Sequence, residues 1–106
     1  MSPHLRRGEL WWADEPVSGR RPVLLLSRQS SIEVLPTVLV APVSRTVRGI
    51  PSEVRLGDEE GLPVESVACL DHVRPIRKTL LTERIGQLST ERMAEAHEAL
   101  RFVIDG

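Results

Sequence analysis

The sequence of 106 residues is poor in several residue types: it has no tyrosine, one phenylalanine, two tryptophans, one cysteine (Cys69) and one lysine (Lys78). A single thiol cannot form an internal disulfide, which fits a reducing cytoplasm. No stretch approaches the roughly 20 apolar residues that span a bilayer, and the N-terminus lacks the apolar run of a signal peptide. We therefore expect a soluble, cytoplasmic protein, with too few aromatic side chains for a full base-stacking platform.

What the chain does contain is typical of a small globular protein. Hydrophobic residues make up 41%, and the length allows one compact domain over residues 1–106. The net charge of −1 argues against a general nucleic-acid coat protein. Residues 20–48, however, contain five arginines and one acid, Glu33. Such a segment predicts either a patch that follows a phosphate backbone or an ordinary solvated face.

The hydrophobic pattern predicts an α+β chain that is mostly β, with one helix at its C-terminal end. Strand-like runs separated by turn residues lie at 9–13, 22–27, 37–43, 52–56 and 66–70, and one more at 84–88. From residue 93 the apolar positions take helical spacing instead. They are Met93, Ala96, Leu100, Val103 and Ile104. Short antiparallel strands with an amphipathic C-terminal helix predict a small, strongly bent barrel.

Three sets of motifs run in order along nearly the whole chain. They are RGELW at 7–11 with GRRPVL at 19–24, then VAPVS at 40–44, and finally GLP at 61–63, SV at 66–67, LDHVR at 70–74 and IGQL at 85–88. Together they resemble the MazF/PemK family of toxin endoribonucleases (mRNA interferases) from type II toxin–antitoxin systems. The resemblance implies a single MazF-like toxin domain over residues 1–106.

The resemblance also implies a fold and an activity. The expected fold is an SH3-like small barrel of bent antiparallel strands with a C-terminal helix, assembled as a homodimer. The expected reaction is sequence-specific cleavage of single-stranded RNA without a metal or other cofactor. The RNA's own 2′-hydroxyl attacks, which leaves 2′,3′-cyclic phosphate and 5′-hydroxyl ends. The expected partner is a MazE-like antitoxin with a disordered acidic tail that competes with RNA for the arginines.

Three residues match catalytic positions of the family. Arg21 matches the arginine before the Pro-Val strand; a guanidinium is a poor base, so we expect it to stabilise transition-state charge. Ser44 matches a threonine or serine whose hydroxyl can donate to a phosphate oxygen. Asp71 matches an acidic position that serves as general base in some relatives. The alternatives are a surface arginine, a turn serine that bonds its own backbone, and a structural carboxylate.

Two departures from the family pattern bear on the acid–base chemistry. Relatives that use the aspartate often have an arginine two residues before it, where this chain has Cys69. Those relatives also use a histidine in the loop before the Pro-Val strand. The corresponding loop here, residues 16–20, is shorter and has no histidine. We interpret Cys69, which lies in an apolar run, as a buried small hydrophobe.

RNA binding is expected from arginines near the motifs and from one histidine. The candidates are Arg20, Arg45, Arg48 and Arg74, together with His72, which could stack on a base. Each could equally be a solvated surface residue.

Other residues admit plainer interpretations. The three histidines are scattered and the carboxylates lack ligand spacing, so no metal site is predicted. Adjacent residues of a strand point to opposite faces; one of Trp11 and Trp12 should therefore lie in the core. The other could line the dimer contact or an RNA groove.

Two alternative functions remain open from the sequence. The first is a CcdB-like poison that shares the fold but binds gyrase. The second is a non-catalytic member that binds only RNA or an antitoxin.

Overall fold

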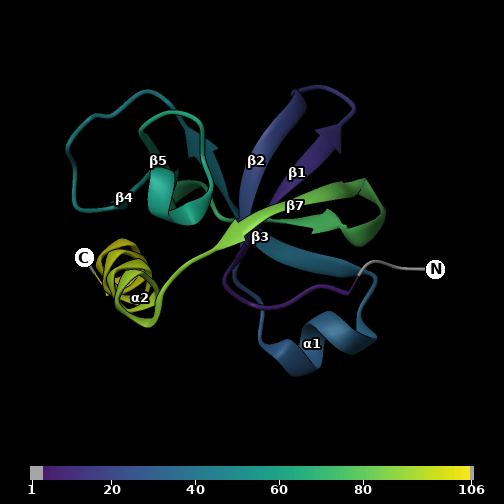
Figure 1. Cartoon of the computed structure of the whole chain (residues 1–106). Helices are drawn as coiled ribbons and strands as arrows, with labels where there is room; N and C mark the ends of the chain where they lie inside the picture. Colours follow the sequence, from purple (N-terminus) through teal and green to yellow (C-terminus); the bar gives the residue numbers. More distant parts are fainter. Residues whose placement is uncertain (1–3, 106) are drawn as a thin grey trace.

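The computed structural model describes residues 4–105, which form a curled antiparallel sheet with a helix at its C-terminal end (Figure 1). The strands are β1 (Glu9–Glu15), β2 (Gly19–Leu25), β3 (Thr37–Ser44), β4 (Glu53–Leu56), β5 (Ser66–Cys69), β6 (Arg74–Arg77) and β7 (Leu81–Gln87). The helices are α1 (Gln29–Val34) and α2 (Thr90–Asp105), and the single 3-10 turns are η1 (Asp58–Glu60), η2 (Leu70–His72) and η3 (Lys78–Leu80). The strand order is β4-β5-β3-β2-β1-β7, with β6 paired to β3.

This architecture confirms the prediction of a mostly β chain with a C-terminal helix. Two elements were not predicted. The first, α1, has six residues and no side-chain cap, so it lacks the periodicity and capping by which a helix is recognised. The second, β6, has four residues, of which one is Pro75 and two are the arginines at its ends, a composition that lowers strand propensity.

The apolar stripe predicted for α2 is buried only in part. Ala96 and Ala99 are fully buried, and Met93 and Leu100 pack against the same core. The far end of the stripe is different, because Val103 and Ile104 are exposed by 40% and 71%. The helix extends past the sheet edge that it covers, so its last turn has nothing to pack on within residues 4–105.

The curled sheet has a hydrophobic core on each face. One core lies between the sheet and α2, which packs beside β4 (Figure 1). The other lies on the opposite face and includes Trp11, Val23 and Ile32 of α1. The alternation along β1 therefore places Trp11 in a core, where it is 6% exposed. Trp12 is half-buried on the opposite face, as the sequence predicted for one of the two indoles.

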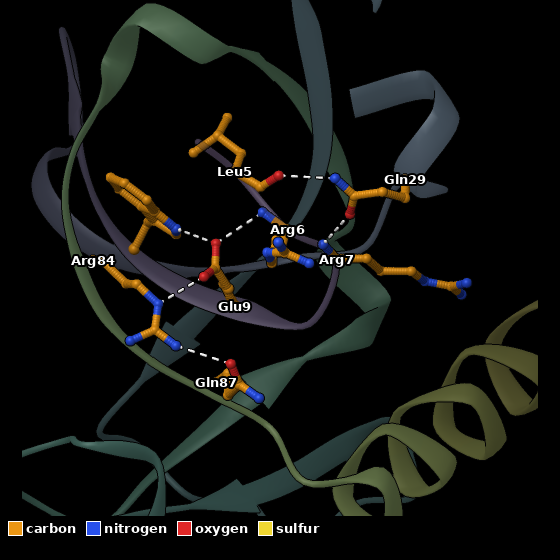
Figure 2. Close-up of polar contacts among 8 residues, drawn as sticks. Leu5, Arg6, Arg7, Glu9, Gln29, Arg84 and Gln87 are labelled. Carbon is orange, nitrogen blue, oxygen red and sulfur yellow. Dashed lines mark hydrogen bonds and ion pairs between the residues drawn. The ribbon is translucent and has the colours of Figure 1, made fainter. Parts of the chain in front are cut away.

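Glu9 is the most densely bonded charged residue of the sheet (Figure 2). It is 4% exposed, and its Oε1 accepts hydrogen bonds from the Arg6 backbone N–H at 2.8 Å and from Trp11 Nε1 at 3.0 Å. Arg84 Nε donates to its Oε2 at 2.6 Å. Burial raises the pKa of Glu9, but these donors together lower it by more, so that the net pKa lies below the ordinary glutamate value.

The lowered pKa of Glu9 predicts a loss of stability in acid. Its contribution to the free energy of unfolding should be complete above the unfolded pKa, near 4.5, and should disappear as the pH falls through the lower folded value. We expect Glu9→Gln to lower the free energy of unfolding by about 1–3 kcal/mol at pH 7. Below about pH 5, the free energy of unfolding of this variant should change less with pH than that of the wild type. Urea unfolding at several pH values measures both effects. Glu33→Gln, at an exposed position, is the matched control; parallel curves for Glu9→Gln and wild type would contradict the assignment.

Two glycines allow the η1 loop to lie directly on β7. A Cβ atom at Gly86 would collide with the carbonyl oxygen of Glu60, and one at Gly61 would lie 2.7 Å from the carbonyl oxygen of Ile85. Gly61 also has a φ of +90°, a left-handed value that favours glycine. This close approach of two backbones fixes the position of Leu62 and the residues that follow it.

The contact at Gly86 predicts that a single methyl group is strongly destabilising there. We expect Gly86→Ala to lower the free energy of unfolding by about 3 kcal/mol, because the obstacle is backbone and cannot rotate away. Gly57→Ala is the control, since a Cβ at Gly57 meets nothing within 4 Å. Thermal unfolding of the two variants measures the difference. Equal melting temperatures would show that the loop can move off β7.

Candidate active site

A pocket of about 220 Å³ lies where β2 begins and β3 ends. Arg20 and Arg21 come from the start of β2, Ser44 ends β3, and Arg45 follows it. The remaining lining residues are mostly apolar: Trp12, Pro22, Val43, Leu62, Pro63, Val64 and Ser66. The strands explain this convergence, because β2 and β3 are antiparallel, with Val23 opposite Pro42. The first residues of β2 therefore lie beside the last residues of β3.

Arg21 is exposed and lightly held. Its Nε donates to the carbonyl oxygen of Ser18 at 3.4 Å, the single side-chain hydrogen bond that it makes to residues 4–105. That bond joins the guanidinium to its own β1–β2 turn. The remaining N–H groups can face a ligand in the pocket, and a guanidinium presents them in the planar fork that suits phosphate.

Ser44 makes the turn hydrogen bond of the plainer interpretation and also lies at the pocket. Its Oγ accepts a hydrogen bond from the Thr46 backbone N–H at 3.0 Å, as a turn serine does. The same hydroxyl lines the pocket and keeps its own hydrogen for donation. The turn bond therefore restrains the rotation of the side chain.

Arg20 lies across the indole of Trp12. Its Cζ is 4.7 Å from the ring centroid, within the range of a cation–π contact. The guanidinium also reaches β7, where it donates to Thr82 Oγ1 at 3.4 Å and lies 3.7 Å from a carboxylate oxygen of Glu83. Arg45, the third arginine of the pocket, is exposed.

The other predicted site residues lie outside this pocket. Asp71 and His72 belong to η2, where His72 Nε2 is 3.8 Å from Asp71 Oδ2. Arg74 forms an ion pair with Glu15. The backbone N–H of Arg48 donates to Glu53 at 3.0 Å. The structure therefore brings together Arg20, Arg21, Ser44 and Arg45 and leaves the remaining four at other positions.

Some pocket residues were not singled out from the sequence. Leu62, Pro63 and Val64 form one wall; the GLP motif marked the segment but not its role. Thr82 and Glu83 approach the site through Arg20, and no local sequence signal identifies them. Only the register of β1 with β7, in which Trp12 lies opposite Glu83, reveals their position.

Residues 4–105 contain neither a candidate metal site nor a helix that could cross a membrane. Within this range no three His, Cys, Asp or Glu side chains gather closely enough to hold a metal ion. No helix of the described chain is long and apolar enough to cross a membrane.

The fold and the pocket define a class of protein: a small bent barrel with a C-terminal helix that gathers three arginines around one pocket. The family model described as "PemK-like, MazF-like toxin of type II toxin-antitoxin system" matches residues 6–104. The chain belongs to this family. This result confirms both the resemblance found in the sequence and the predicted fold class.

Individual relatives agree with the family assignment. The chain is 40% identical over 100 residues to the "Probable endoribonuclease MazF5" of Mycobacterium tuberculosis, and the match covers 93% of this chain and 92% of that protein. The solved Mycobacterium tuberculosis toxin MazF-mt6 superposes with a TM-score of 0.85 at 32% identity, over 92% of this chain and 96% of that one. A MazE–MazF crystal structure from Deinococcus radiodurans gives a TM-score of 0.80 at 28% identity, over 98% and 96% of the two chains.

Cys69 provides a test of the local structure beside η2. The thiol is buried, and burial first, then Glu53 and Asp71, raise its pKa above the ordinary cysteine value. Because the thiolate is the reactive form, we expect iodoacetamide at pH 8 to modify the folded protein about 100-fold more slowly than the guanidinium-unfolded protein. Mass spectrometry of timed samples measures both rates. Similar rates would show that the thiol is accessible in the folded protein.

Proposed function

We propose that this chain is the toxin of a type II toxin–antitoxin system and acts as an endoribonuclease. The observation that carries the proposal is the meeting of Arg21 and Ser44, from two different strands, in one pocket with Arg20 and Arg45. Relatives named as endoribonucleases over almost the same length support it. They also favour RNA cleavage over the gyrase-binding alternative.

The pocket supports a reaction in which the RNA supplies its own nucleophile. The 2′-hydroxyl oxygen attacks the adjacent phosphorus while its proton leaves to a base, and the 5′-oxygen departs with a proton. The products are a 2′,3′-cyclic phosphate and a 5′-hydroxyl. The transition state carries negative charge on the non-bridging oxygens, and we propose that Arg21 and the Ser44 hydroxyl donate hydrogen bonds to them.

The proton acceptor must come from outside the side chains that line the pocket. None of the side chains that line the pocket is a carboxylate or an imidazole, and a guanidinium is a poor base. Asp71 is the candidate that the resemblance supplies, and it lies beyond the pocket rim on η2. We propose that it accepts the proton only when bound RNA extends across η2, where His72, Arg48 and Arg74 would also meet the strand.

Partners follow from the same proposal. We propose a cytoplasmic homodimer that binds single-stranded RNA and needs no cofactor. The MazE–MazF structure from Deinococcus radiodurans contains an antitoxin, and a MazE-like antitoxin with an acidic tail would here compete with RNA for Arg20, Arg21 and Arg45.

The central test is cleavage of a long unstructured RNA in EDTA by the wild type and by Arg21→Ala. We expect discrete cuts with cyclic phosphate ends, and a rate about 100- to 1,000-fold lower for the variant, since one transition-state donor is lost. Primer extension and end-group analysis locate and identify the cuts. Arg101→Ala, which removes an exposed arginine from α2, is the control for lost charge.

Asp71→Asn tests the proton acceptor in the same assay. A drop comparable to that of Arg21→Ala would support the assignment, whereas an unchanged rate would remove Asp71 from the mechanism. The absence of cuts across a sequence-diverse RNA from folded wild-type protein would refute the endoribonuclease proposal.

A further inference from the structure

Trp12 is a large aromatic surface beside the arginines of the pocket. It is half-buried and lines the pocket together with Arg21 and Ser44. On the sheet it lies between two opposite residues, Pro22 of β2 and Glu83 of β7. Pairing with both neighbouring strands therefore fixes the position of Trp12, whose ring lines the pocket and presents one face to Arg20.

That face is covered by the side chain of Arg20, for which a phosphate would be a stronger partner. The Arg20 guanidinium lies 4.7 Å from the ring centroid and is held by Glu83 at 3.7 Å and by Thr82 at 3.4 Å. Arg20 and Glu83 are 48% and 62% exposed in their side chains. Exposed pairs of this length add little stability, so these contacts can be exchanged readily.

A nucleic-acid backbone offers Arg20 a stronger partner. A phosphate accepts two parallel hydrogen bonds from a guanidinium, whereas Glu83 reaches it only at 3.7 Å. Transfer of Arg20 to a phosphate would uncover the indole. Any unpaired base can stack on an exposed tryptophan, because every base has a π face.

Resting on the proposed function, we propose that Trp12 is a nucleobase-stacking residue for single-stranded RNA and that Arg20, held by Glu83, covers it until a phosphate binds. The stacked base would belong to a nucleotide next to the scissile phosphate, since the ring shares the pocket with Arg21 and Ser44. Trp12 is then a positioning residue for the reaction. Glu83 sets how readily the position opens, since its carboxylate both holds Arg20 and repels phosphate.

The test uses a short 2′-O-methyl oligonucleotide copied from a mapped cut site, which lacks the nucleophile and cannot be cleaved. Fluorescence anisotropy of the labelled strand measures the dissociation constant. We expect Trp12→Ala to weaken binding about 10-fold or more, and Trp12→Phe to stay within about threefold of wild type because a phenyl ring still stacks. Glu83→Gln should tighten binding about threefold more than Glu91→Gln does. Glu91 is an exposed residue of α2, so its variant measures the effect of removing one negative charge alone.

Intrinsic fluorescence provides an independent readout. Trp11 is buried and donates to Glu9, so quenching on addition of the oligonucleotide should arise from Trp12. The quenching should disappear in Trp12→Phe and should weaken when the nucleotide beside the cut is abasic.

The outcomes separate this inference from the proposed function. The stacking role would be overturned if folded Trp12→Ala bound the oligonucleotide with wild-type affinity. It would also be overturned if folded Trp12→Ala and Trp12→Phe lost affinity equally. In either case the RNA cleavage of the proposed function would stand. Equal effects of Glu83→Gln and Glu91→Gln would overturn the covering role of Arg20. Neither binding nor cleavage by wild-type protein would overturn both the inference and the proposed function.

Discussion

The buried carboxylate of Glu9 ties together the parts of the barrel on which the pocket depends. It accepts hydrogen bonds from the segment before β1, from β1 itself and from β7, through Arg6, Trp11 and Arg84. The pairing of β1 with β7 shifts register on both sides of the Trp11–Trp12 pair. A carboxylate bonded to Trp11 and Arg84 holds the two strands together between these irregularities. The same bond that keeps Trp11 in the core therefore keeps Trp12 and Glu83 opposite each other at the pocket side.

The distribution of ion pairs explains how a chain of net charge −1 can present a basic site. Arg84 is paired with Glu9, Arg74 with Glu15 and Arg92 with Glu60, so acidic side chains within the fold neutralise the charge of these arginines. Arg21 and Arg45 have no ion pair within residues 4–105, and Arg20 has a long one. The guanidinium groups of the pocket, where β2 begins and β3 ends, are therefore available to a ligand. Other arginines without an ion pair in the described chain, such as the exposed Arg28 and Arg101, lie outside the pocket. The overall charge of the sequence thus says little about the charge of the pocket.

The sequence predicted the elements that have a strong local signal and the site residues that flank one strand pair. The apolar runs of β1, β2, β3 and β5 identified those strands, and helical spacing identified α2. The family resemblance assigned Arg21 and Ser44 to one site, and the pairing of β2 with β3 explains why they lie close together. The rest depends on non-local geometry. The 3-10 turn η2 carries Asp71 away from the pocket, and the approach of Glu83 to Arg20 depends on a register shift that no local pattern encodes. The exposed end of α2 likewise depends on where the sheet edge lies and not on the helix's own periodicity.

The composition of the pocket also constrains how a phosphodiester could react in it. Three arginines and two serine hydroxyls provide many donors, while the lining side chains include neither a carboxylate nor an imidazole. A site of this kind stabilises developing charge better than it moves protons. Such a balance suits a reaction with an internal nucleophile, because the 2′-hydroxyl is already held beside the phosphorus and needs orientation more than activation. Orientation in turn requires that the bases on either side be fixed. A rigid indole at the edge of the arginine cluster, anchored through β1 to the Glu9 network, supplies the kind of surface that this requirement demands.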